Sequence, residues 1–273
     1  MKKRGFLILA IVAVVAVVIG VVLFIVLSGD GINEGDSPIR TPQELSARLS
    51  DMQRSVDDIE RVFTDIQNQG IIDAEALREA GDALATSYSD ITTSAFVANG
   101  IRSFDEFPRY FTLTETLDAR VPEFAGIVKD VADIMHSVQE MNPIIRLMFT
   151  DDTFTTPADM NSRITAMYGR LAESSTIRVS SSATSMIEST QRIVAIFSQI
   201  SDDRCSTDQY IQTDICVEYI SLLDNIYSQQ NSLLDFVMTA TEEPSVLFYT
   251  RDIQEFINLV FSFNFEEVEA TDE

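Results

Sequence analysis

The chain has 273 residues, of which 45% are hydrophobic and 9% aromatic. This is enough apolar material to fold one sizeable domain, and it excludes a disordered acidic tail, which lacks the apolar surface to offset chain entropy. Because 43 acidic residues face 19 lysines and arginines, the net charge is −24. Such a chain repels nucleic-acid phosphates and anionic lipid headgroups, so we expect no nucleic-acid partner.

The first 28 residues predict a transmembrane signal anchor. Three basic residues (2–4) precede an apolar run over residues 6–27 that contains no charged side chain. As a helix this run spans about 33 Å, which matches the ~30 Å hydrocarbon core of a bilayer. Basic residues remain on the cytoplasmic side, so the N-terminus is expected in the cytoplasm and the body outside it. No later segment is long and apolar enough for a second span.

Two alternatives to a retained anchor remain open. One is a secretory peptide that is cleaved before Gly29. The other follows from the opening residues KKRGF at positions 2–6, which precede the apolar helix and resemble the start of a type IV prepilin. This resemblance implies a cut between Gly5 and Phe6 and a mature helix that packs into a filament. The chain departs from the family pattern at Ala10, where a Glu is expected.

Residues 29–40 contain three glycines and a proline and predict a flexible stalk. A helical bundle is then expected over residues 41–265, followed by an acidic tail over 266–273. Its first helix begins with Thr41 as the cap, Pro42 in the first turn and Glu44 three residues after the cap. The apolar residues of this helix alternate steps of four and three, as a coiled-coil-like interface requires: Leu45, Leu49, Met52, Val56, Ile59, Phe63 and Ile66.

Further helices are predicted by the same periodicity. The second follows a turn around Gly70, runs from Leu77 to Ala98 and forms an antiparallel hairpin with the first. A third starts near Pro122, and Pro143 breaks or kinks it. One continuous helix is favoured over 157–200, with a break near Ser174 as the alternative. Two more helices carry these apolar positions: Ile215, Tyr219, Leu222, Ile226, Leu233 and Val237, then Tyr249, Ile253, Phe256 and Val260.

Few residue patterns point to chemistry. Cys205 and Cys216 are the only cysteines, and outside the cytoplasm such a pair predicts a disulfide. His136 is the only histidine and falls on the polar side of its helix, which favours a solvated side chain over a catalytic one. No phosphate-binding loop, nucleophile motif or zinc motif occurs. We therefore expect no catalytic residues, no cofactor and no metal site.

One aromatic segment is a candidate for partner docking. Aromatic residues and arginines are the typical composition of an interface hot spot, and here they cluster in an acidic chain. The alternative is that these aromatics cover the end of the bundle. The segment also includes Pro108, and its candidate docking residues are Phe104, Phe107, Arg109, Tyr110 and Phe111.

The predicted fold is all-α: an N-terminal transmembrane helix, then an antiparallel bundle of about five to six long helices. The predicted function is a single-pass, membrane-anchored, extracytoplasmic module that binds or scaffolds other proteins without catalysis. A self-assembling structural subunit, pilin-like or coiled-coil, is the alternative, and a ligand-sensing ectodomain is a third. The membrane, through residues 6–27, and a protein partner or a second copy are the expected contacts.

Overall fold

The fold is all-α, as predicted. The computed structural model describes residues 39–68, 72–102, 104–150, 157–203, 213–263 and 265. These residues form eight helices and no strand. In chain order the helices are α2 (Pro42–Gln67), α3 (Ala74–Thr92), α4 (Ala95–Ile101), α5 (Phe107–Thr150), α6 (Pro157–Ala172), α7 (Ile177–Asp203), α8 (Asp214–Ala240) and α9 (Glu243–Ser262).

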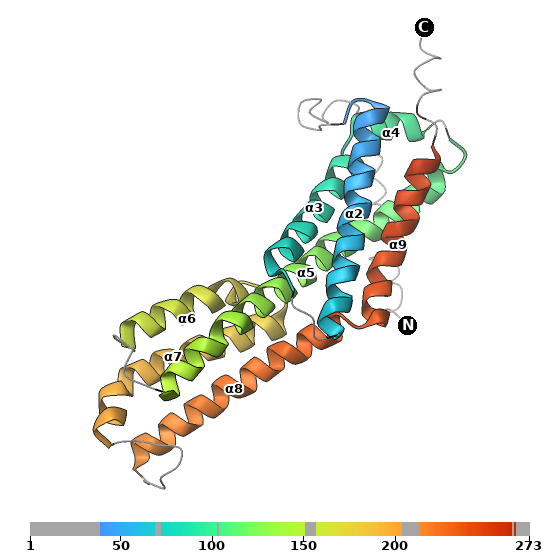
Figure 1. The fold of residues 1–273 in the computed structure, drawn as a ribbon. Helices are drawn as coiled ribbons and strands as arrows, with labels where there is room; N and C mark the ends of the chain where they lie inside the picture. Colours follow the sequence, from blue (N-terminus) through green and yellow to red (C-terminus); the bar gives the residue numbers. More distant parts are fainter. Residues whose placement is uncertain are drawn as a thin grey trace, which may run out of the picture.

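Two helical bundles share the long helix α5 (Figure 1). α2, α3, α9 and the N-terminal half of α5 pack together in the first bundle, and α4 lies at its end. α6, α7, α8 and the C-terminal half of α5 form the second bundle. α5 has 44 residues, so it is about 66 Å long and runs through both bundles. The buried apolar side chains of the two bundles form one cluster.

The first helix of the body confirms the sequence prediction. Thr41 Oγ1 accepts a hydrogen bond from the Glu44 amide at 3.2 Å, and the Glu44 carboxylate accepts one from the Thr41 amide at 3.0 Å. This reciprocal capping box satisfies amides that otherwise lack partners at a helix start. All seven predicted apolar positions of α2 are buried.

The prediction that Pro122 starts a helix is wrong, because α5 begins at Phe107 and continues through Pro122. A proline inside a helix costs about 3 kcal/mol. Here the buried side chains continue without interruption on both sides of the proline, from Leu117 and Val121 to Phe124 and Val128. Their packing outweighs the local cost. Pro143 also lies within α5, which continues to Thr150.

The favoured single helix over residues 157–200 is also wrong, because α6 and α7 are separated by residues 173–176. Ser174 and Thr176 donate side-chain hydrogen bonds to Asp130 Oδ2 at 2.8 and 2.7 Å. Hydroxyl groups that bond away from their own helix favour a break. The predicted second helix is divided as well: it ends at Thr92, and Ser94 caps the short helix α4.

Within the described part of the chain, no helix is both long and apolar enough to cross a membrane. The predicted anchor over residues 6–27 lies outside the described residues, as does nearly all of the stalk and all of the acidic tail. The anchor therefore stays a prediction.

Candidate functional site

An aromatic cluster closes one end of the first bundle. We call it the end cluster, and it consists of Phe96, Phe104, Tyr110, Phe256, Phe263 and Phe265. The ring centroids of Phe104 and Phe263 lie 4.8 Å apart, and those of Phe96 and Phe265 lie 5.5 Å apart. A Cβ atom on Gly100 would lie 2.6 Å from the Phe265 ring, so a glycine is needed at this position. The chain just after α9 is thereby held against α4.

The five predicted docking residues do not form one surface, because the helix that carries four of them points them in different directions. Phe104 and Tyr110 pack inward in the end cluster. Phe107 and Phe111 are exposed and lie one turn apart on the same side of α5. Arg109 is two residues from Phe107, which places it about 200° around the helix. The prediction that the aromatics cover the bundle end is confirmed for Phe104 and Tyr110.

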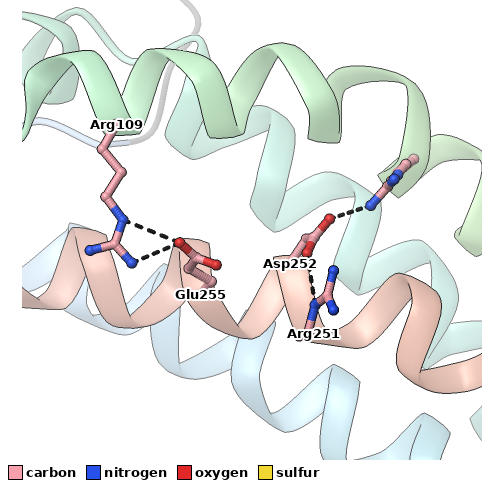
Figure 2. A network of polar contacts seen from close by, with 5 residues as sticks. Arg109, Arg251, Asp252 and Glu255 are labelled. Carbon is pink, nitrogen blue, oxygen red and sulfur yellow. Dashed lines mark hydrogen bonds and ion pairs between the residues drawn. The ribbon is translucent and has the colours of Figure 1, made fainter.

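Arg109 belongs instead to a line of ionic contacts between α5 and α9 (Figure 2). Its guanidinium donates from Nη2 and Nε to Glu255 Oε1 at 2.7 and 3.2 Å. Further along, Asp252 pairs with Arg120, and its Oδ1 also lies 3.3 Å from Arg251 Nε. The Arg109–Glu255 pair is exposed, and such pairs contribute about 0–1 kcal/mol, whereas the Arg120–Asp252 pair is more buried. Their main effect is to set the register of α9 on α5.

A groove lies beside this line of ion pairs. We call it the α9 groove, and its volume is about 670 Å³. α9 supplies most of its wall, α2 contributes Glu60, and α5 contributes Arg109. A second hollow of about 450 Å³ shares Glu60 and Leu247 and extends the surface toward the C-terminal end of α2. The residues of the main groove are Glu60, Arg109, Leu247, Thr250, Arg251, Gln254, Glu255, Asn258, Leu259 and Ser262.

Large apolar side chains stand exposed on the groove side of α9. Leu247 is 51% exposed and Phe261 is 48% exposed. They are 14 residues apart, which is about four turns and the same side of the helix. Arg251 lies between them on that side, with a side chain that is 77% exposed. The combination is apolar contact area at both ends and hydrogen-bonding groups in the middle.

This surface as a whole is not evident from the sequence, although Phe261 is one of four phenylalanines near the C-terminus that could either dock a partner or cover the bundle end. The periodicity of the last helix marks only its buried stripe. That stripe consists of Tyr249, Ile253, Phe256 and Val260. Leu247 and Phe261 lie on the other side of the same helix. The sequence does carry one signal of this surface: the last helix has more large apolar residues, such as Leu247 and Phe261, than its buried stripe requires.

Burial shifts the pKa of several titratable groups. Burial raises the pKa of Tyr88, whose hydroxyl lies 2.8 Å from Asp118 Oδ1, so this phenol stays protonated at neutral pH. Burial also raises the pKa of Tyr110 and of Tyr168. Burial raises the pKa of the Asp130 carboxyl, although hydrogen bonds from two hydroxyl groups oppose the shift.

The remaining predicted site residues have simple positions. His136 is exposed, as its place on the helix predicted. Cys216 is buried near the start of α8, but Cys205 lies outside the described residues, so the disulfide between them stays a prediction. Among the side chains that the structure describes, no cluster of three His, Cys, Asp or Glu residues is placed to hold a metal ion.

Comparison with protein-family models, with curated proteins and with solved structures finds no match to this chain. Its function therefore has to be argued from its own residues.

Proposed function

We propose that the protein is a membrane-tethered, extracytoplasmic helical module that binds a partner protein through the α9 groove and performs no catalysis. The observation that carries the proposal is a set of exposed side chains on one side of α9: Leu247 and Arg251 line the open groove, and Phe261 lies outside its lining, next to Ser262 at its end. Aromatic residues and arginine provide most of the binding energy at protein interfaces. Exposed apolar side chains that share a surface with polar groups are typical of an interaction site.

The open form of the surface favours a protein over a small molecule. A drug-sized ligand is usually enclosed on most of its surface by a concave pocket. The α9 groove instead runs along an exposed helix, and the adjoining hollow lengthens it to the end of α2. Gln254 spans the floor between α9 and α2, with its Nε2 2.7 Å from Gln53 Oε1. This hydrogen bond holds α9 against α2, and the elongated groove has the form that accommodates a helix or an extended segment of another protein.

The position of the stalk supports the tethered arrangement. Ile39 is buried, and its carbonyl accepts a hydrogen bond from Ser94 at 3.1 Å, so the chain enters the first bundle beside α4. The described chain therefore begins at the end of the first bundle that carries the end cluster (Figure 1), and the predicted anchor precedes it in the sequence. The second bundle lies at the opposite end (Figure 1). A body of this shape projects away from a membrane and leaves the sides of both bundles accessible.

Site-specific photo-crosslinking of the full-length chain in its native membrane tests the proposal. A photoreactive residue replaces Leu247 or Phe261, and the matched control places it at Glu115, which is exposed on α5 away from α9. We expect an adduct of one defined mass at both Leu247 and Phe261 and none at Glu115. The variant Arg251→Glu is expected to reduce that adduct without changing the folding of the chain.

Two other outcomes would change the proposal. Adducts that contain only multiples of this chain would replace it with a self-assembling structural subunit. Equal labelling at Glu115, Leu247 and Phe261, or none at Leu247 and Phe261, would remove the groove as the binding site.

A further inference from the structure

A second surface, on α8 in the other bundle, is independent of the α9 groove. α8 buries Leu223, Ile226, Leu233 and Val237 in the core. Yet four other large apolar side chains of the same helix are between 41 and 59% exposed: Val217, Ile220, Tyr227 and Met238. They span about 32 Å of helix. Soluble proteins rarely leave so regular an apolar line uncovered without a use for it.

The contacts of α8 show that this line is not the face that meets α7. Side chains spaced by seven residues make the α7 contacts: Glu218 pairs with Arg192, Asn225 Nδ2 donates to Ser189 Oγ at 2.7 Å, and Ser232 bonds with residues of α7. The exposed line begins two residues further on, at Ile220 and Tyr227, so it lies about 200° away around the helix. We call this side the outer face of α8.

The outer face has the spacing of a coiled-coil interface. Ile220, Tyr227 and Leu234 repeat every seven residues, and Asp224, Asn231 and Met238 form a second row in the same period. Together they alternate steps of four and three, which is the pattern that lets one helix pack along another. Asp224 and Asn231 are both exposed within this pattern. A polar residue at such a position fixes the register and the identity of the partner helix.

The charges on α8 determine what kind of helix fits. α8 carries Asp214, Glu218, Asp224 and Asp235 and no Lys, Arg or His. Glu218 and Asp235 pair with Arg192 and Arg178 of α7, so the carboxylate that the outer face itself presents is Asp224. A second copy of α8 would bring further carboxylates and no cation to this face, which opposes self-association. An anionic lipid surface is disfavoured for the same reason. A lysine or arginine opposite Asp224, by contrast, gains an ion pair inside the interface.

We propose that the outer face of α8 binds a cationic amphipathic helix from a partner protein. Apolar residues of that helix pack against Ile220, Tyr227 and Leu234, and a Lys or Arg of that helix pairs with Asp224. About 20 residues of partner helix cover the exposed line. The proposal does not depend on the α9 groove, because the two surfaces lie on different helices and in different bundles.

A designed peptide pair provides the test. The probe is a synthetic helix of four heptads with Leu at a and d, except for one Lys at a d position, and with Lys at e and g. A scrambled peptide of identical composition lacks the amphipathic face, and a third peptide carries Glu in place of every Lys. Binding to the purified full-length chain is measured by fluorescence anisotropy at physiological ionic strength.

We expect the cationic helix to bind at least about tenfold more tightly than the scrambled peptide. Tyr227→Ser is expected to weaken that binding, whereas Phe111→Ser, the same kind of loss on α5, leaves it unchanged. Asp224→Lys is expected to reverse the preference between the cationic and anionic peptides. Circular dichroism checks that each exposed substitution leaves the helical content intact.

Three results would overturn the proposal. Equal binding of the scrambled peptide would reduce the effect to attraction toward an acidic chain. An unchanged preference in Asp224→Lys would remove the ion pair on which the register depends. A dimer of the chain that Tyr227→Ser dissociates would assign the outer face to a second copy. None of these results bears on photo-crosslinking at Leu247 or Phe261, so failure here is distinguishable from failure of the α9 groove.

Discussion

Replacing Tyr168 with Phe should stabilise the protein. Tyr168, on α6, is the largest side chain that is fully buried in the described part of the chain, with 0% exposure. No hydrogen-bond partner for its hydroxyl lies in the described part of the chain. A buried polar group without a partner costs about 1–3 kcal/mol. Removing the hydroxyl leaves a void of about 15 Å³, which at 24 cal/mol per Å³ costs about 0.4 kcal/mol. The net gain in the free energy of unfolding should therefore be about 0.6–2.6 kcal/mol.

Tyr88→Phe is the matched control, because it removes the same atom from a buried tyrosine whose hydroxyl has a partner. The Tyr88 hydroxyl donates to Asp118 Oδ1 at 2.8 Å, and Asp118 itself is exposed. After the substitution the carboxylate regains water, so the loss should be limited to about 1 kcal/mol. Each variant deletes one oxygen, but Tyr168→Phe should raise the free energy of unfolding and Tyr88→Phe should lower it.

Urea unfolding followed by circular dichroism measures both variants. The dependence of free energy on urea concentration should stay unchanged, so that midpoints compare stabilities directly. If the two bundles unfold in separate steps, each transition is fitted by itself, because Tyr168 and Tyr88 lie in different bundles. A loss of 1 kcal/mol or more in Tyr168→Phe would refute the reasoning, since it would mean that the hydroxyl makes a hydrogen bond after all.

Four further substitutions test other parts of the fold. Gly100→Ala should lower the free energy of unfolding by about 1–3 kcal/mol, because its Cβ would lie 2.6 Å from the Phe265 ring. Gly126→Ala is the control: its Cβ has no neighbour within 4 Å, so it should raise the free energy of unfolding by about 0.5–1 kcal/mol. Thermal unfolding measures both. Burial raises the pKa of Asp130 in the folded state, so its stabilising contribution is complete below the unfolded pKa and is lost as pH rises through the folded pKa. Asp130→Asn should therefore gain stability relative to the native chain as pH rises, which a series of melts at different pH values would show. Cys216→Ser removes the predicted disulfide and should lower the free energy of unfolding by about 3 kcal/mol. A reducing agent should destabilise the native chain by a similar amount and should have no further effect on the variant.

Local signals in the sequence predicted some helices correctly and failed where distant packing decides. α2 follows from its own residues, since Thr41, Glu44 and the apolar spacing are all within one segment. α5 does not, because Pro122 is a local stop signal, and only the burial of Val121 and Phe124 against other helices overrides it. The break between α6 and α7 depends on Asp130, which is more than 40 residues away in sequence.

The five candidate docking residues do not share one surface, for a geometric reason. Residues 104–111 are adjacent in the sequence, but a helix distributes adjacent residues around its whole circumference. Arg109 therefore reaches α9, Tyr110 enters the core, and Phe111 faces solvent. The two surfaces proposed above are instead made of residues spaced along one side of a helix. Finding them from sequence requires knowing which side the core already occupies.

The way in which the bundles are joined bears on how two bound partners would sit relative to each other. α5 passes through both bundles without a break, and α8 leads into α9 through the turn at Thr241 and Glu242. Gln67 at the end of α2 secures that turn, because its Nε2 donates to the Met238 carbonyl at 3.0 Å and to Thr241 Oγ1 at 2.6 Å. Two connections resist bending and twisting better than one. A partner on the outer face of α8 and another in the α9 groove would therefore be held at a fixed separation, which is the property that distinguishes a scaffold from a pair of linked binding domains.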